Sequence, residues 1–329
     1  RETPQLPPPQ ELLDALRAGR RFVLTSHVGP DGDAIGSGLG LARVLSALGK
    51  DSVVWNRDPA PRFYAPLPGS AGIHVGEEPP TGFPEDFDAV VVLECPSLER
   101  CGLEEQVRQL PLFNIDHHLG NDAYGAIDWV DPRSPSLGAM IFRLARALGV
   151  EVDADTATTL YLTLVTDTGG FRFPNATREA FQAAAMLVER GAEPAQVAHW
   201  LYESQPLAAV RLIAEVLSSL ELHLNGRIAT VFLERAMVER CGAEPGDSEG
   251  LIDYPRSIAG VEAVALLREL PEGRVKVSLR SRGDIDVEAV ARQRGGGGHK
   301  NAAGVTLPEP IALERARQQI VESLAAALP

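Results

Sequence analysis

Apolar positions in the first half of the chain follow two alternating patterns. Short continuous apolar runs are typical of buried strands, and longer stretches with an apolar residue every three or four positions are typical of helices. The predicted strands cover residues 21 to 26, 51 to 56, 88 to 94, 112 to 116 and 126 to 130. The predicted helices cover residues 10 to 19, a stretch ending at Gly49, and residues 137 to 149 and 155 to 166. This alternation predicts an α/β fold with a mostly parallel sheet covered on both faces.

The pattern changes in the second half. Helical stretches at 177 to 190 and 206 to 220 are followed by two pairs of strand-like runs. An Asn-Gly pair separates the first two runs, which predicts a hairpin, and PEGR joins the second two. We therefore expect three parts: a metal-binding catalytic domain over 1–190, a helical connector over 191–218 and a smaller α+β substrate-binding domain over 219–329, closed by a final helix.

Composition supports this division and restricts the function. A chain of 329 residues with 44% hydrophobic residues exceeds the size at which single cores usually split. The formal net charge of −14 repels polyanions and argues against binding along long nucleic acid. Residues 254 to 300 are the exception, with nine Lys or Arg against six Asp or Glu. An anionic substrate is therefore expected to be bound locally.

The cysteines and the longest apolar runs indicate in which cellular compartment the protein is expected. Three widely spaced cysteines, with no CxxC pair, favour neither a disulfide framework nor a zinc site. No apolar run approaches the roughly 18 residues that span a bilayer. We expect a cytoplasmic protein without a membrane partner.

Histidine and carboxylate side chains lie where the predicted strands and one helix end. They are His27, Asp31 and Asp33; Glu94; Asp116, His117 and His118; and Asp167. Parallel sheets bind ligands at the carboxyl edge of their strands, so these groups are expected to converge. Imidazole with several carboxylates suits a divalent ion such as Mn²⁺, with Mg²⁺ as the alternative. The set is large enough for two ions about 3.5–4 Å apart, bridged by one carboxylate.

Each piece taken alone has a simpler explanation. Asp31 and Asp33 are compatible with an ordinary turn that caps the next helix. Glu94 is compatible with a solvated strand end. Asp167 is compatible with a helix-end acid, although a carboxylate there opposes the helix dipole and favours a nearby cation. Because all of them end elements of one sheet domain, a metal site explains them better together.

A glycine run in the second domain is the candidate anion site. Four consecutive glycines disfavour helix and strand, and they let backbone N–H groups approach an anion. A flexible linker is the alternative, but basic residues bracket the run and the compact AAGVTL segment follows it. Arg256, Ser257 and Arg280 lie nearby in sequence and suit phosphate oxygens. Isolated arginines are usually solvated surface residues, which is the alternative explanation for Arg256 and Arg280.

Four ordered motifs carry a family resemblance. HVGPDGDAIGS, IDHH, TDTGGFRF and GGGGHKNAAG resemble the DHH phosphoesterase family with its C-terminal DHH-associated domain. The stretch GLIDYPRSIAGVEAVALLRE is most similar to the NrnA-type branch. That branch degrades very short oligoribonucleotides and dephosphorylates 3'-phosphoadenosine 5'-phosphate. The resemblance implies a short oligonucleotide or nucleotide substrate, an active site in the cleft between the domains, and a homodimer as a candidate assembly.

The resemblance also implies a role for each residue. One Mn²⁺ would be held by His27, Asp31 and the bridging carboxylate, and the other by Asp33, His117, Asp167 and the same bridge. Asp116 would orient a ligand, while His118 and His299 would address the scissile phosphate. The residues expected to bind the substrate in the second domain are Arg256, Ser257, Arg280, Gly296, Gly297, Gly298, His299 and Asn301.

The sequence differs from the family pattern at two positions. The bridging position is Asp in the family and Glu94 here, which predicts reduced or metal-selective activity. Ala139 lies where relatives often carry Glu.

Three alternative functions stay open. A family II pyrophosphatase shares the DHH pattern but not the glycine-rich His loop. A RecJ-like single-strand exonuclease is disfavoured by the short chain and its 5% aromatic content. A nucleotide-binding sensor that has lost catalysis is the third alternative, for which Glu94 is the hint.

Overall fold

The computed structural model describes residues 5–248 and 250–328, which form two compact units. Unit 1 ends at Ser204 and unit 2 begins at Gln205. This boundary lies inside the segment predicted as a connector. No helix among the described residues is both long and apolar enough to span a bilayer.

Unit 1 is built on a six-stranded sheet whose pairings are all parallel. The strand order is β3-β2-β1-β4-β5-β6. The strands are β1 (Arg21–Thr25), β2 (Asp51–Asn56), β3 (His74–Val75), β4 (Ala89–Leu93), β5 (Leu112–Asp116) and β6 (Ile127–Val130). This confirms the predicted parallel α/β sheet; β3, with two residues, was not predicted. The order reverses between β1 and β4, and such switch points are where open α/β sheets bind ligands.

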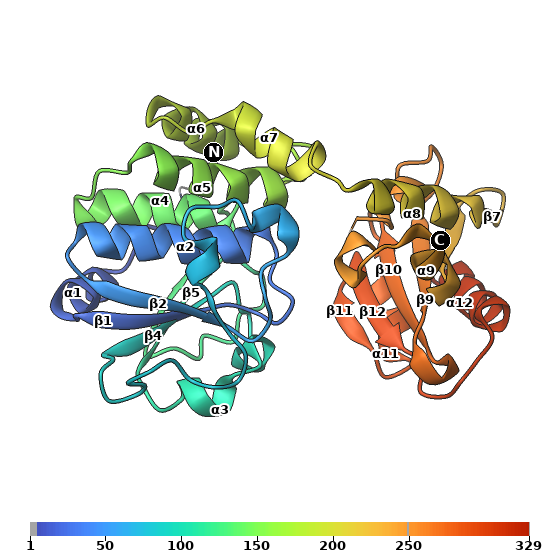
Figure 1. Cartoon of the computed structure of the whole chain (residues 1–329), viewed down its shortest axis with the longest axis horizontal. Helices are drawn as coiled ribbons and strands as arrows, with labels where there is room; N and C mark the ends of the chain where they lie inside the picture. Colours follow the sequence, from blue (N-terminus) through green and yellow to red (C-terminus); the bar gives the residue numbers. More distant parts are fainter. Residues whose placement is uncertain (1–4, 249, 329) are drawn as a thin grey trace. The chain divides into compact units, whose positions relative to one another are not determined.

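Helices cover both faces of this sheet (Figure 1). In β4, Val91 and Leu93 pack into one core, and Val90 and Val92 pack into the other. This alternation explains why the strand is apolar at every position. One face carries α2 (Gly32–Ala47), α4 (Leu137–Leu148) and α5 (Ala154–Asp167); the other carries η3 (Leu98–Cys101) and α3 (Glu104–Val107). Unit 1 also contains α1 (Gln10–Ala18), η1 (Arg62–Tyr64), η2 (Ser70–Gly72), α6 (Arg178–Glu189) and α7 (Pro194–Tyr202).

Small residues bring α2 close to α5. A Cβ atom on Gly36 would lie 2.5 Å from Cγ2 of Thr163, and one on Gly40 would lie 2.5 Å from Cδ2 of Leu160. Larger residues at these two glycines would push the helices apart. The close approach fixes the N-terminal turn of α2 relative to the C-terminal turn of α5.

Unit 2 contains a six-stranded mixed sheet in the order β11-β12-β10-β9-β8-β7. Its strands are β7 (Glu221–His223), β8 (Ile228–Leu233), β9 (Ala263–Glu269), β10 (Val275–Ser281), β11 (Gly297–His299) and β12 (Ala302–Thr306). Both predicted hairpins are confirmed, because β7 pairs antiparallel with β8 and β9 with β10. Asn225 and Gly226 in the first turn have φ of 54° and 84°, as this turn chemistry requires. The parallel pairing of β8 with β9 was not predicted.

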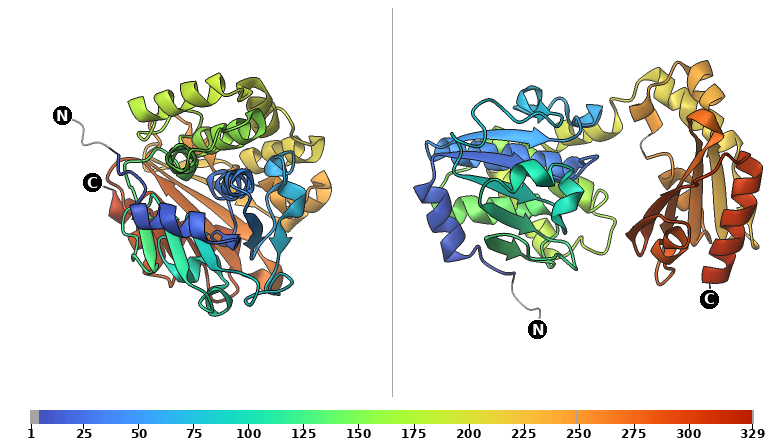
Figure 2. Two further views of the ribbon diagram at one scale, coloured as in Figure 1. Left: turned by 90° about the vertical axis from the view of Figure 1, so that its left-hand side faces the viewer. Right: turned by 90° about the horizontal axis from the view of Figure 1, so that it is seen from below.

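Helices also cover both faces of the second sheet (Figure 2). One core contains residues of α11 (Val287–Arg292) and α12 (Leu313–Ala327). The other contains residues of α8 (Leu207–Ser218) and α9 (Arg235–Cys241), with Ile252 just before α10 (Asp253–Arg256). The short helices η4 (Pro245–Ser248) and η5 (Pro271–Gly273) complete the unit. This arrangement confirms the smaller α+β domain.

One expectation about unit 2 is wrong. Four glycines were expected to disfavour a strand, yet Gly297 and Gly298 lie in β11 and pair with Gly304 and Ala303 of β12. A Cβ atom on Gly298 would lie 2.5 Å from the carbonyl oxygen of Ala302. Close packing on β12 therefore accounts for glycine at that position.

A buried ion pair fastens the N-terminal arm to unit 1. The carboxylate of Asp131 is fully buried and accepts hydrogen bonds from the Leu6 backbone N–H (2.9 Å) and from Nη1 of Arg143 (3.0 Å). The same Nη1 donates to the carbonyl of Leu6 at 2.8 Å, and the guanidinium lies over the ring of Trp129. Asp131 thus links the arm, the end of β6 and α4.

Replacing this buried carboxylate is expected to destabilise unit 1. Asp131→Asn leaves the partly buried Arg143 without a counter-charge, so the free energy of unfolding should fall by about 3 kcal/mol. Urea denaturation followed by tryptophan fluorescence measures unit 1 selectively, because Trp55, Trp129 and Trp200 all lie in it. The matched control is Asp155→Asn, which removes an exposed partner of Arg43 and should cost less than about 1 kcal/mol. Equal stabilities of the two variants would contradict the prediction.

Candidate metal centre

Strand and helix ends place the predicted metal ligands at one edge of the sheet in unit 1. His27 follows β1, Glu94 follows β4, His117 follows β5, Asp33 lies in the first turn of α2, and Asp167 is the last residue of α5. Ligand atoms of Asp33, Glu94, His117 and Asp167 all lie within 4.8 Å of one another. Glu94, His117 and His118 form a second, overlapping group.

His117 is oriented for metal binding. Its Nδ1 lies 3.1 Å from the carbonyl oxygen of Ser134. Because a carbonyl only accepts, Nδ1 carries the hydrogen and Nε2 faces the carboxylates. Nε2 lies 2.9 Å from Oε1 of Glu94, 3.6 Å from Oδ2 of Asp33 and 3.9 Å from Oδ2 of Asp167. Burial alone lowers the pKa of His117, but these carboxylates raise it well above 6.5. A divalent cation would compete with a proton for this nitrogen.

Asp33 and Asp167 are carboxylates held in unfavourable surroundings. Burial and the neighbouring Asp167 raise the pKa of Asp33 to about 7. Burial also raises the pKa of Asp167 to about 6, with Glu94 and Asp31 adding to the effect. Asp33 accepts hydrogen bonds from the backbone N–H groups of Leu137 (2.6 Å) and Gly138 (3.0 Å) at the start of α4. Clustered acids with raised pKa values are typical of sites that bind a cation.

Glu94 provides the test of whether a cation fits. Its side chain is only 3% exposed, and burial raises its pKa. Oε1 contacts His117, whereas Oε2 is buried without a hydrogen-bond partner within 5–248 and 250–328. A buried carboxylate oxygen that lacks a donor is costly. A metal ion coordinated by Oε2 would remove this cost, so the residues present fit the group.

His27 and Asp31 lie beside the cluster but outside its tightest group. Nε2 of His27 is 3.9 Å from Oδ1 of Asp31. Asp31 caps α2 by accepting from the N–H of Ala34 at 3.0 Å. Its charge contributes to the raised pKa values of Asp33 and Asp167, which places it within electrostatic range of the cluster.

Asp116 orients the second histidine of the DHH motif. Its Oδ1 lies 2.8 Å from Nδ1 of His118 and accepts from the backbone N–H of His117 at 2.8 Å. Burial opposes its ionisation, but the hydrogen bonds from His118 and Asn121 hold the pKa of Asp116 below its usual value. Asp116 is therefore an ionised carboxylate that fixes the ring of His118.

Sequence reasoning missed the residues that support the ligands. Ser134 acts through its backbone carbonyl, which any residue could supply, so the sequence carried no signal for it. Asn175 donates to Oδ2 of Asp167 at 2.9 Å, and Asn121 donates to Oδ2 of Asp116 at 2.6 Å. Both follow their motifs by a few residues, and a search for amides near the predicted ligands could have found them.

The predicted anion-binding residues of unit 2 lie in or directly beside α10, β10 and β11, with Ser257 just after α10, Gly296 just before β11 and Asn301 just before β12. Burial lowers the pKa of Arg280, and Asp253 and Arg256, whose side chains lie 3.7 Å apart, are both within electrostatic range of Arg280. The side-chain amide of Asn301 donates to Oγ of Ser281 at 2.8 Å and to the carbonyl of Gly283 at 3.1 Å. This amide thus supports the turn after β10. The side chain of His299 lies outside the described part of the structure.

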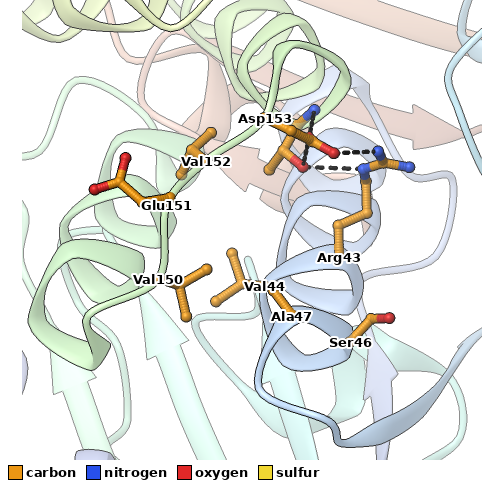
Figure 3. A pocket seen from close by; sticks show the side chains of 9 residues that line it. Arg43, Val44, Ser46, Ala47, Val150, Glu151, Val152 and Asp153 are labelled. Carbon is orange, nitrogen blue, oxygen red and sulfur yellow. Dashed lines mark hydrogen bonds and ion pairs between the residues drawn. The ribbon is translucent and has the colours of Figure 1, made fainter.

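A hollow of about 310 Å³ lies at the other end of α2 (Figure 3). Arg43 crosses it and bonds to Oδ2 of Asp153 at 2.9 Å. Asp33 is in the first turn of α2 and Arg43 is ten residues further along, a rise of about 15 Å. This hollow therefore does not belong to the metal cluster.

The chain matches known proteins in both units. Residues 21–165 match the DHH family, N-terminal domain, and residues 228–326 match the DHHA1 domain. A Thermus thermophilus protein named bifunctional oligoribonuclease and PAP phosphatase NrnA is 37% identical over 95% of this chain and 91% of its own length. The Bacillus subtilis protein of the same name is 27% identical over 90% and 92%. The crystal structure of an exopolyphosphatase-related protein from Bacteroides fragilis gives a TM-score of 0.88 at 28% identity, covering 96% of this chain and 95% of that one.

The matched segments coincide with the site. The DHH match covers the candidate ligands from His27 to His117, and Asp167 follows two residues after it. The DHHA1 match covers the predicted anion-binding residues of unit 2. These findings confirm the family resemblance seen in the sequence. The chain belongs to the DHH family, in the NrnA branch, whose members it matches from the DHH domain through the C-terminal DHHA1 domain.

Proposed function

We propose that this protein is a Mn²⁺-dependent phosphoesterase that hydrolyses short oligonucleotides and 3'-phosphoadenosine 5'-phosphate. The observation that carries the proposal is the group of Asp33, Glu94, His117 and Asp167, whose ligand atoms lie within 4.8 Å of one another and of which Asp33 and Glu94 are buried. The names of the relatives support the substrate class. A cytoplasmic location and a homodimer stay predictions.

The proposed roles follow the family pattern and the contacts in unit 1. One ion would be held by His27, Asp31 and Glu94. The second ion would be held by Asp33, His117 and Asp167, together with the same Glu94. Bound ions of this kind lower the pKa of a water molecule and stabilise charge on phosphoryl oxygens. His118, fixed by Asp116 through Nδ1, would bind the scissile phosphate or assist the leaving oxygen.

Unit 2 is proposed to bind the substrate through its basic residues. Arg256 lies within electrostatic range of Arg280, and Arg282 donates to the carbonyl of Arg256 at 2.6 Å. A guanidinium group binds phosphate oxygens well because it offers several donors in one plane. The overall charge of −14 repels longer polyanions, so a confined cationic patch favours short substrates.

Turnover by the purified protein tests the proposal. With Mn²⁺, we expect mononucleotides from a diribonucleotide and phosphate from 3'-phosphoadenosine 5'-phosphate, with both activities abolished by a chelator. Asp33→Asn should lower kcat at least about 100-fold, or about 2.7 kcal/mol, whereas Asp155→Asn should match the wild type. Cleavage of pyrophosphate alone would favour the pyrophosphatase. Nucleotide binding without turnover, with turnover gained by Glu94→Asp, would favour the sensor.

Metal affinity should increase with pH. Asp33 has a pKa of about 7 and Asp167 of about 6, and each must lose its proton before it binds a cation. The pKa of His117 is also raised, which acts in the same direction. The dissociation constant for Mn²⁺ should fall at least about tenfold between about pH 5 and about pH 8. Calorimetric titration in buffers of different ionisation enthalpy measures the released protons. An affinity that does not change over this range would contradict the prediction.

Arg280 should affect substrate binding more than turnover. We expect Arg280→Ala to raise KM about tenfold, because a charge-assisted hydrogen bond contributes about 1.5–3 kcal/mol, with kcat within about threefold of the wild type. Steady-state kinetics with a diribonucleotide measure both constants. The matched control is Arg315→Ala on α12, an exposed arginine that should leave both unchanged. An unchanged KM for Arg280→Ala would remove Arg280 from the substrate-binding set.

A further inference from the structure

The side chain of Asn121 connects the ends of β4 and β5 beneath the candidate metal centre. Its Nδ2 donates to Oδ2 of Asp116 at 2.6 Å and to the carbonyl oxygen of Cys95 at 3.2 Å. Cys95 directly follows Glu94, and Asp116 directly precedes His117. One amide group thus contacts a residue beside Glu94, after β4, and a residue beside His117, at the end of β5.

The hydrogen bonds fix which way this amide points. Its Oδ1 accepts from the backbone N–H of Ala123 at 2.8 Å, and a backbone nitrogen can only donate. On the other side, a carboxylate and a carbonyl can only accept, so Nδ2 must face Asp116 and Cys95. Both hydrogens of Nδ2 are therefore used at the site.

The buried Asn114 and the half-buried Asp128 hold Asn121 in place. Nδ2 of Asn114 donates to Oδ1 of Asn121 and to Oδ1 of Asp128, both at 2.8 Å. Asn114 lies in β5 and is fully buried, and Asp128 lies in β6. A chain of hydrogen bonds thus runs from β6 through Asn114 and Asn121 to Asp116. Because its donors and acceptors are matched, such a network holds a single arrangement.

We infer that Asn121 is a positioning residue for the phosphoester hydrolysis proposed above, on which this inference rests. Asn121 keeps Asp116 in the orientation that binds Nδ1 of His118. It also holds the carbonyl of Cys95, the residue after Glu94, whose own backbone has a φ of 59°. Removing the amide leaves Oδ2 of the buried Asp116 without this donor. The ring of His118 then loses its fixed direction, while the cationic residues of unit 2 keep their contacts.

The kinetic test separates positioning from substrate affinity. In Asn121→Ala and Asn121→Asp, kcat on a diribonucleotide should fall about 10- to 100-fold, the range typical of residues that orient ligands, and KM should stay within about threefold. Asn225→Asp is the matched control, because it makes the same change in an exposed turn of unit 2. Thermal melting identifies the folded variants, and Asn121→Ala carries the comparison should Asn121→Asp not fold.

A double variant tests whether Asn121 acts through Asp116. In Asp116→Asn the carboxylate is already absent, so adding Asn121→Ala should slow turnover no more than about threefold further. The inference is wrong if the double variant loses kcat by the product of the two single effects. It is also wrong if Asn121→Ala changes KM alone. Wild-type protein without turnover would contradict the proposed function instead. Active wild-type protein with Asn121→Ala at full kcat would contradict this inference alone.

Discussion

The repulsion between buried carboxylates is the constraint on which the architecture of unit 1 depends. Asp33, Glu94 and Asp167 surround Nε2 of His117, and without compensation such a group would separate or take up protons. The parallel sheet resists separation, since β1, β4 and β5 are neighbours and deliver their following residues to one edge. Tight packing of α2 on α5 does the same for Asp33 and Asp167.

Backbone groups supply part of the compensation, beside side-chain donors such as Asn175. The start of α4 donates two N–H groups to Asp33, which combines hydrogen bonding with the positive end of the helix dipole. The carbonyl of Ser134 sets the tautomer of His117. Asp131 begins the loop that contains Ser134, and its own N–H donates to the carbonyl of Asp116. The buried ion pair of Asp131 with Arg143 and the N-terminal arm thus stabilises the loop that orients a candidate ligand.

The sequence predicted the ligands better than their supports, for a physical reason. Strand ends and helix ends follow from hydrophobic periodicity, so the convergence of Glu94, His117 and Asp167 could be expected from chain order alone. Contacts such as that between Ser134 and His117 depend on loop paths, which periodicity does not determine. In unit 2 the glycine run was expected to bind an anion through its backbone, which stays a prediction, and the structure adds a packing reason for glycine at Gly298. Local composition could not distinguish these two causes.

Glu94 combines these effects at the position where the family resemblance led us to expect Asp. Its backbone has a φ of 59°, a conformation that costs a residue with a side chain about 1–3 kcal/mol. Its N–H nevertheless still bonds to the carbonyl of Ile115 at 3.3 Å, so β4 stays in the ladder while the side chain turns toward His117. The left-handed backbone and the length of the glutamate side chain together determine where its carboxylate lies. Oε1 of Glu94 lies 2.9 Å from Nε2 of His117, within the group formed with Asp33 and Asp167.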